Sequence, residues 1–403
     1  MARLVAVMQW REGTVQQVRG RWPGAVEYAV QLAPTDGDAA PSDTVRALAY
    51  TALVGEPQVG DRVLLNASAL LRGLGTGGLA FVVAAPDRLP PDPAPADGPQ
   101  GHIVKARYTP QQQMLLAVDE QASPHHAVMT SDVVATGDLG GLPVVVADLH
   151  SALPAVLAGV RAERPDARVV YLMTDGGALP IAFSRNVAGL KEAGWLAGTV
   201  TVGQAYGGDH EAVTLHSGLL AARHVLDADL AVVIQGPGNV GTGTTWGYTG
   251  VAAGEALNAT VVLNGRGVAA LRVSQADPRE RHRGISHHSH TAYGRICLVP
   301  ADLVTITPSD PFEELVLRQA QELAAEASGR LALVPVEGSG LDAALASSPV
   351  RLSTMGRGLD QDRAAFRYSA AAGLHAARLT AGSMSTRRAN PARSRRSRVR
   401  ASD

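Results

Sequence analysis

A dense cluster of histidines lies between residues 282 and 290, in the sequence HRGISHHSH. Neutral imidazole binds borderline divalent metals well, and it also serves as a general acid or base. Three interpretations are open: a metal site, metal-free histidines that transfer protons or contact phosphate, or a solvated or structural loop. His287 and His288 are the candidate catalytic histidines, and the candidate metal ligands are Asp277, His282, His287, His288 and His290.

A glycine-rich turn, GPGNVGTGT, occupies residues 236–244 directly after an apolar run. Such a turn lets backbone N–H groups approach a phosphate, especially when a helix follows, and we expect a helix from Trp246. A dinucleotide site would need an acid after the next strand, where we place Asn264. A turn that merely packs tightly is the alternative. The candidate anion ligands are Gly236, Gly238, Gly241, Thr242, Gly243, Thr244, Arg281 and Arg283, because arginine favours anionic ligands.

Three acidic residues complete the candidate catalytic set. Asp175 follows an apolar run in MTDGG, and Asp209 and Glu211 belong to GGDHE. A carboxylate after a strand can act as a base, orient a histidine or share a metal. A helix N-cap is an equally good interpretation of Asp175.

The elements that would position these residues lie in segment 101–380, where short apolar runs alternate with amphipathic helical patterns. This alternation predicts a doubly wound, mostly parallel α/β sheet, in which ligands bind beyond the carboxyl ends of the strands. The expected strands are 143–147, 168–173, 198–202, 230–234, 260–263, 303–306 and 331–336, with a short one at 272–276; the expected helices include 151–162, 209–226, 312–327 and 362–379.

The two ends of the chain differ from this middle part. Residues 1–85 contain short β-branched runs broken by glycine, proline and aspartate, which predicts a small β-barrel. Residues 86–100 are rich in proline and are expected to be a linker. Residues 381–403 are rich in arginine and without periodicity, so we expect a disordered tail.

The composition limits the function classes. The net charge is −1, so nucleic acid binding is disfavoured except through the basic tail. The chain has one cysteine, Cys297, which excludes an internal disulfide. No signal-peptide pattern and no apolar run of membrane-spanning length is present, which favours a cytoplasmic protein without a membrane partner. A homodimer is the default expectation.

Five motifs occur in order: GHIVKARYTPQQ (101–112), LMTDGGALPIAFS (172–184), GGDHEAV (207–213), GPGNVGTGT (236–244) and RHRGISHHSHTA (281–292). Together they resemble the bacterial family catalogued as domain of unknown function 3866, over roughly residues 1–380. The resemblance implies no activity, cofactor or catalytic residue.

The residues therefore carry the functional prediction. We expect a protein that binds a small anionic metabolite, phosphorylated or nucleotide-like, and that acts as a hydrolase or transferase. Its histidines would work as acid–base groups or with a divalent metal ion as cofactor. The alternative is a non-catalytic protein that senses a ligand or associates with nucleic acid.

Overall fold

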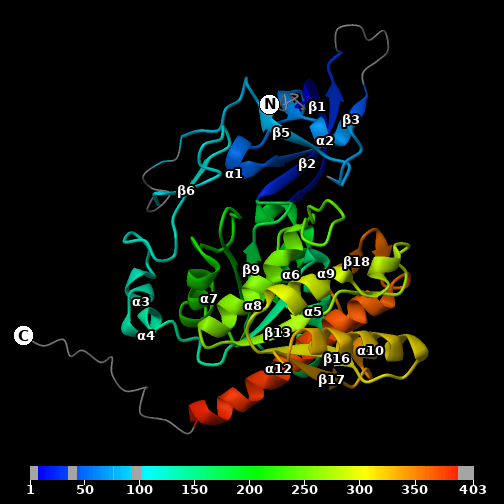
Figure 1. Cartoon of the computed structure of the whole chain (residues 1–403). Coiled ribbons are helices and arrows are strands. Elements are labelled where there is room, and N and C mark those ends of the chain that lie inside the picture. The colour runs from blue at the N-terminus through cyan, green and yellow to red at the C-terminus, as the bar shows by residue number, and fades with distance from the viewer. Residues whose placement is uncertain (1–7, 35–42, 76, 93, 95–100, 389–403) are drawn as a thin grey trace, which may run out of the picture.

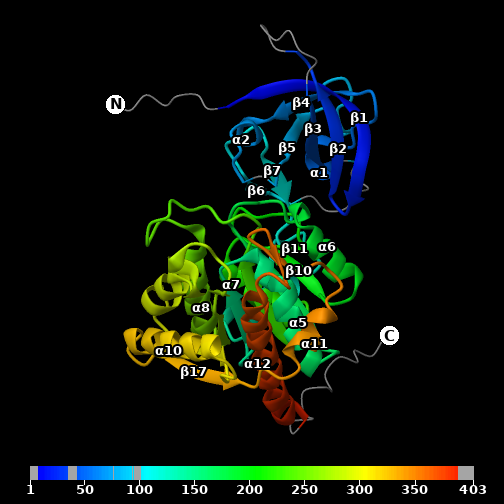
Figure 2. The same cartoon turned by 90° about the vertical axis from the view of Figure 1, so that its right-hand side faces the viewer.

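The computed structural model describes residues 8–34, 43–75, 77–92, 94 and 101–388, with side chains as far as residue 380. Figures 1 and 2 show a small β-barrel above a larger layered α/β part. Residues 93 and 95–100 of the predicted linker and the tail from residue 389 lie outside the described residues. The last helix, however, continues to Arg388, into the segment that was predicted to be disordered.

The N-terminal strands form a closed barrel in the order β1-β2-β3-β5-β4. Neighbouring strands pair antiparallel, except β3 and β5, which run parallel. Closure leaves no open strand edge, and buried valine, leucine, alanine and tyrosine side chains fill the interior. The elements are β1 (Trp10–Trp22), β2 (Ala25–Leu32), β3 (Thr44–Tyr50), α1 (Thr51–Val54), β4 (Arg62–Asn66), α2 (Ser68–Leu71) and β5 (Ala80–Ala84).

The larger part is built on an eight-stranded sheet in the order β11-β10-β9-β12-β8-β13-β16-β17. Every pair of neighbours is parallel. β8 is the first of these strands in the chain. The strands β9 to β12 lie on one side of it and β13, β16 and β17 on the other. Such a change of direction opens a crevice at the carboxyl ends of the central strands. The strands are β8 (Pro143–Ala147), β9 (Val169–Thr174), β10 (Gly198–Thr201), β11 (His210–Glu211), β12 (Leu230–Gln235), β13 (Arg266–Ala270), β16 (Ala301–Ile306) and β17 (Leu331–Val336).

Helices cover both faces of this sheet (Figure 2). One face carries α5 (Leu153–Glu163), α11 (Leu341–Ala346) and α12 (Arg363–Arg388). The other carries α7 (Leu215–His224), α8 (Ala252–Val262) and α10 (Pro311–Glu326), whose Asp310 cap accepts a hydrogen bond from the Glu313 N–H. The predicted fold class, a barrel followed by a doubly wound, mostly parallel sheet, is confirmed.

Shorter elements fill the connections. Among them, α9 and the π-helix η6 follow one another directly and carry His287, His288 and His290, whereas His282 ends η5. The short elements are β6 (Ile103–Lys105), β7 (Gln113–Leu115), α3 (His126–Met129), α4 (Asp132–Ala135), η2 (His150–Ala152), η3 (Ile181–Phe183), α6 (Arg185–Glu192), η4 (Thr249–Val251), β14 (Val273–Ser274), η5 (Glu280–His282), β15 (Gly284–Ile285), α9 (His287–Ser289), η6 (His290–Ile296), β18 (Ser353–Thr354) and β19 (Arg357–Gly358).

Some predicted elements were wrong. The run 260–263 is not a strand: α8 continues to Val262, with Thr260 on its buried face and Val262 exposed, and Leu263 follows as its C-cap. Asn264, at φ 55°, ends the helix in the left-handed conformation, and the sheet strand is the next segment, β13. The predicted strand 272–276 is only the short β14, which pairs with β15 outside the main sheet. The predicted helix 209–226 begins later, at Leu215, because β11 takes its first residues.

The barrel contacts the sheet part through a few specific groups. The Trp22 indole donates a hydrogen bond to the Ala182 carbonyl oxygen over 2.6 Å, and the Arg185 guanidinium lies 4.2 Å above the Trp22 ring. Arg185 also forms an ion pair with the buried carboxylate of Glu27 in the barrel. Arg46, another barrel residue, pairs with the same carboxylate, with 2.7 Å between Nε and Oε1. Among the described helices, none has the length and apolar character required to cross a membrane.

Candidate functional site

A cavity of ≈ 640 Å³ opens at the carboxyl ends of the central strands. Its lining includes the glycine-rich loop that follows β12 and residues of the segment 272–288 that follows β13. This is the crevice that the reversal of strand order predicts. The cavity is lined by backbone groups and by arginine, histidine and amide side chains, namely Arg272, Arg279, Arg281, His150, His282, His288, Gln235, Asn239 and Asn186 among others.

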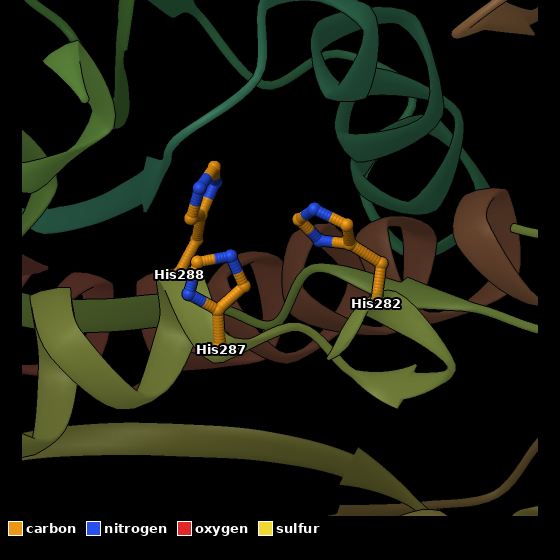
Figure 3. A group of neighbouring side chains, drawn as sticks. All are labelled: His282, His287 and His288. Carbon is orange, nitrogen blue, oxygen red and sulfur yellow. The ribbon is translucent and has the colours of Figure 1, made fainter. Parts of the chain in front are cut away.

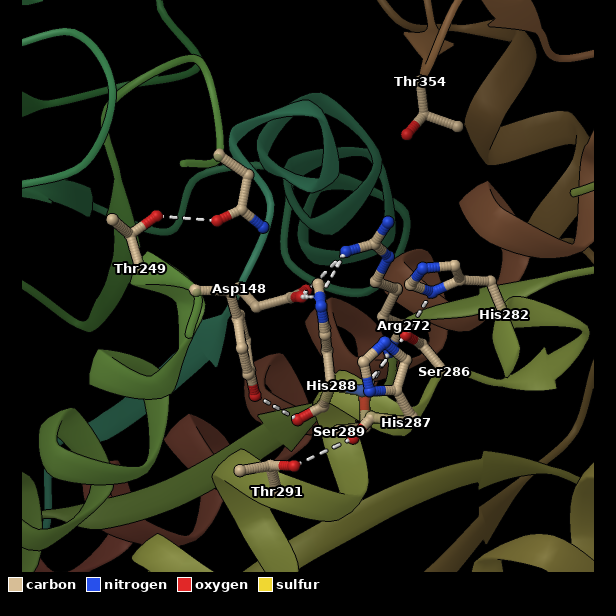
Figure 4. A network of polar contacts seen from close by, with 12 residues as sticks. Asp148, Thr249, Arg272, His282, Ser286, His287, His288, Ser289, Thr291 and Thr354 are labelled. Atoms are coloured by element: carbon tan, nitrogen blue, oxygen red, sulfur yellow. Dashed lines mark hydrogen bonds and ion pairs between the residues drawn. The ribbon is translucent and has the colours of Figure 1, made fainter. Parts of the chain in front are cut away.

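A buried network of Asp148, Arg272 and His288 lies beside this cavity (Figure 4). Arg272 Nη1 lies 2.8 Å from His288 Nδ1 and 3.3 Å from Asp148 Oδ2, and Asp148 Oδ2 lies 3.6 Å from His288 Nδ1. Burial opposes ionisation of the Asp148 carboxyl, but the charge of Arg272 and the contact with His288 outweigh it and lower its pKa. At neutral pH the network therefore contains a carboxylate that neutralises the guanidinium.

The chain holds His288 from several directions. The Ser286 hydroxyl caps α9 by accepting a hydrogen bond from the His288 N–H. The Tyr248 ring stacks on the imidazole with 3.7 Å between ring centroids, and its hydroxyl donates to the His288 carbonyl oxygen over 2.7 Å. The buried Tyr293 hydroxyl lies within hydrogen-bonding distance of the Val146 and Ala270 carbonyl oxygens, at the ends of β8 and β13. The orientation of this imidazole is therefore set before any ligand binds.

Three of the predicted histidines come together (Figure 3). His287 and His288 project from α9 and His282 from the end of η5, and their ligand nitrogens lie within 4.8 Å of one another. Burial, followed by the charges of Arg272 and Arg279, lowers the pKa of His282 to about 3. Burial, followed by neighbouring His288, lowers the pKa of His287 to about 4. Both imidazoles are neutral at pH 7 and keep a lone pair free for a ligand.

The glycine-rich loop brings most of the predicted anion ligands to the cavity. Within the described residues, the backbone N–H groups of Gly238, Asn239 and Gly243 donate no hydrogen bond. A side-chain carbon at Gly243 would lie 3.8 Å from Arg281 Nη2, so this arginine lies against the loop. The loop residues that line the cavity are Gly236, Pro237, Gly238, Asn239, Gly241, Thr242 and Gly243.

The helix expected to start at Trp246 is not there. Trp246 is exposed in the loop, and α8 begins at Ala252 after the turn η4. The loop also serves packing, since a side-chain carbon at Gly236 would lie 2.1 Å from the Ala178 carbonyl oxygen. Any anion held here would therefore rely on backbone amides and arginine rather than on the positive end of a helix.

The three predicted catalytic carboxylates do not join the histidines. Asp175 accepts hydrogen bonds from the N–H groups of Gln204 and Ala205 and so shapes the loop after β10. Asp209 pairs with Lys191 and accepts from the Thr199 N–H at 2.9 Å. The buried Glu211 carboxylate pairs with the buried Lys105 ammonium at 2.7 Å. Each carboxylate already has its partners and holds a loop or an edge of the sheet.

Several further predicted residues lie outside the histidine group. The Asp277 carboxylate is held by Arg279 at 2.9 Å and by Arg357 at 3.3 Å. His290 faces Glu326, with 3.4 Å between Nδ1 and Oε2. Arg283 is exposed and does not line the cavity, and the hydroxyl of Thr244 bonds within the loop to Thr242.

Two groups central to the site were not among the predicted site residues. Arg272 follows β13, and we had expected Asn264 at the end of that strand because the strand was placed too early. Asp148 follows β8, and the only sign in the sequence that it belongs to the site was its place directly after a strand, in DLHS. Its partners come from segments more than a hundred residues away, and no local pattern reveals such contacts.

A third such residue, His150, lines the cavity from the neighbouring turn η2. Its Nδ1 lies 3.1 Å from the Tyr171 hydroxyl and its Nε2 lies 2.7 Å from the Ser184 hydroxyl. The Tyr171 hydroxyl donates to the Ile234 carbonyl oxygen, so it accepts from Nδ1, and Nε2 in turn accepts from Ser184. Burial lowers the pKa of His150 to about 4, which keeps this imidazole neutral.

Replacing His150 by glutamine should make stability less dependent on pH. Because the folded pKa lies below the unfolded value of about 6.5, this histidine contributes stability that is complete above pH 6.5 and is lost as the pH falls towards about 4. Between about pH 7 and about pH 5, the variant's unfolding free energy in urea should fall by about 2 kcal/mol less than that of the wild type. Parallel pH profiles for the two proteins would contradict the assignment.

Comparison with known proteins gives a family match over most of the chain. The profile of DUF3866, described as a protein of unknown function, matches residues 46–373. The match begins within β3 and contains the whole parallel sheet, the glycine-rich loop and all three clustered histidines. No curated protein and no solved structure matches the chain. Because the matched region covers most of the sequence, the chain belongs to the DUF3866 family.

Proposed function

We propose that this protein binds a small anionic metabolite, phosphorylated or nucleotide-like, in the cavity and hydrolyses it or transfers one of its groups. The observation that carries the proposal is the position of the Arg281 guanidinium beside the glycine-rich loop, in the lining of the same cavity. In the described part of the chain, Arg281 forms no ion pair, whereas Arg272 and Arg279 have carboxylate partners. Arg281 therefore contributes a positive charge that no carboxylate neutralises.

Two kinds of donor would hold the anion. The unused N–H groups of the loop can bond phosphate oxygens from the backbone, and the Arg281 guanidinium can add charge-assisted hydrogen bonds. Buried amide groups support a polar ligand as well, because Gln235 Oε1 and Asn239 Nδ2 have no hydrogen-bond partner within the described residues. Both amides line the cavity, and a bound ligand would satisfy them.

The reaction would take place at the part of the cavity that the clustered histidines line. His282 and His288 line the same cavity as Arg281, so a phosphoryl group held by the loop would have imidazoles beside it. In hydrolysis, water attacks phosphorus and gives up one proton, while the bond to the leaving oxygen breaks, its electron pair stays on that oxygen, and the oxygen takes up a proton. The lowered pKa of His282 leaves its imidazole uncharged, so arginine supplies the positive charge that binds the anion.

Replacing Arg281 by alanine should weaken phosphate binding about tenfold, since it removes a charge-assisted hydrogen bond of roughly 1.5 kcal/mol. Titration calorimetry with inorganic phosphate, pyrophosphate and a nucleoside monophosphate measures this. Arg283→Ala is the matched control, because Arg283 is equally exposed but does not line the cavity. Equal losses in the two variants, or a wild-type protein that binds none of the three anions, would contradict the proposal.

An assay for the release of phosphate from the bound ligands distinguishes an enzyme from a ligand sensor. An enzyme should lose turnover when His288, which lines the cavity, is replaced by alanine, while phosphate affinity largely survives, because the loop and Arg281 are unchanged. A protein that binds tightly but never releases phosphate from any bound ester would be a sensor. In that case the hydrolase or transferase part of the proposal would be wrong.

A further inference from the structure

The cluster of His282, His287 and His288 has the composition and compactness of a metal site. We propose that it binds one late first-row divalent ion, with zinc as the reference ion. Three imidazole ligands favour zinc, copper, nickel or iron over magnesium and calcium, which prefer oxygen ligands. Figure 3 shows the rings approaching one another from two segments, with His287 and His288 on one side and His282 on the other.

Two of the histidines already offer a free ligand nitrogen. His282 Nδ1 lies 2.7 Å from the Ser286 hydroxyl, and in the tautomer in which Nδ1 donates to that hydroxyl the Nε2 lone pair is available to an ion. His287 Nε2 is buried, and within the described residues it has no hydrogen-bond partner. A buried polar atom without a partner is costly, and coordination to an ion would satisfy it. The hydroxyl that holds the far nitrogen of His282 also fixes the orientation of its ring, as is usual for metal-ligating histidines.

His288 requires one rearrangement. Arg272 carries only hydrogen-bond donors, so its contact at 2.8 Å makes His288 Nδ1 an acceptor and places the proton on Nε2. Coordination through Nε2 requires the proton on Nδ1 instead. Asp148 Oδ2, 3.6 Å from Nδ1, is the acceptor within reach. An ion would therefore replace Arg272 by Asp148 as the partner of His288, in the carboxylate–histidine–metal arrangement that strengthens such ligands.

The cluster must also contract. Nitrogens bound tetrahedrally to one zinc ion lie about 3.4 Å apart, whereas the three here lie within 4.8 Å. His287 is only half-buried, and rotation of its side chain can shorten these distances. Because His282 and His288 line the cavity, the remaining coordination position would face the proposed anion. The inference thus deepens the proposed function, since the ion would polarise the reacting group.

Metal titration of the full-length chain, stripped with a chelator and free of any histidine tag, tests the site. We expect the wild type to bind one equivalent of zinc and His287→Ala to bind it about 100-fold more weakly or worse. His290→Ala is the matched control, because His290 belongs to the same segment but faces Glu326. It should bind zinc like the wild type. Cobalt(II) should give the wild type the intense visible absorption bands of a nitrogen-ligated, four- or five-coordinate ion.

The proposal is overturned if the wild type takes up no zinc and shows only the spectrum of hydrated cobalt. It is also overturned if His287→Ala binds zinc as tightly as the wild type, or if His290→Ala loses as much affinity. The cobalt spectrum needs no variant, so it decides the matter even if a substitution prevents folding. The assay contains no phosphate, so its failure leaves the anion titrations standing as a separate test of the proposed function.

Discussion

Replacing Gly159 by alanine should lower the unfolding free energy by about 3 kcal/mol, although alanine is the better helix former. A side-chain carbon at this position of α5 would lie 1.9 Å from the Ala370 carbonyl oxygen of α12. The two helix backbones are equally close at Gly373 of α12, where an added side-chain carbon would lie 1.9 Å from the Val156 carbonyl oxygen of α5. The atoms in the way belong to helix backbones and cannot rotate aside, so the two helices must move apart.

Urea denaturation followed by circular dichroism measures this loss. Gly20→Ala is the control, because the nearest atom to its new side-chain carbon would be 3.8 Å away, at the end of an arginine side chain. That variant should change stability by less than about 1 kcal/mol. A Gly159→Ala protein as stable as the control would show that the α5–α12 contact is looser than the structure describes.

The periodicity of the sequence was sufficient to predict the fold. Short apolar runs such as 143–147 and 230–234 coincide with β8 and the first five residues of β12, because both faces of the sheet are buried there and so whole runs are apolar. The pattern was wrong where a β-branched run continues a helix, at 260–263. β13 follows with the sequence RGVAA, whose glycine and alanines carry little strand propensity. Packing against its neighbours, rather than local preference, makes this segment a strand.

The candidate site was predictable only as far as it is local in sequence. His282, His287 and His288 lie within seven positions of one another, so their grouping is visible in the sequence. The partners of a carboxylate cannot be identified from the sequence in this way. Asp209 and Asp148 look alike in the sequence, but the first holds Lys191 at the edge of the sheet and the second holds Arg272 at its centre. Which carboxylate serves the site is decided by contacts between distant segments.

The buried pair of Asp148 and Arg272 leads to the second large prediction. Replacing Asp148 by alanine should cost about 3 to 5 kcal/mol of unfolding free energy, because it leaves a buried guanidinium without its counter-ion. The two side chains are only 6% and 10% exposed, so water cannot take the place of the carboxylate. Glu163→Ala is the matched control, since the Glu163–Arg378 pair is 34% and 48% exposed and should contribute at most about 1 kcal/mol.

The double variant Asp148→Ala/Arg272→Leu identifies the cause of that loss. If the uncompensated charge is responsible, removing the guanidinium as well should restore most of the lost stability, because a buried ion pair can be replaced by apolar side chains at little net cost. If the lost volume is responsible, the double variant should be no more stable than Asp148→Ala. A recovery would mean that the pair is not needed for the fold, and that its role is to hold His288 at the cavity, where the proposed anion and metal ion would meet.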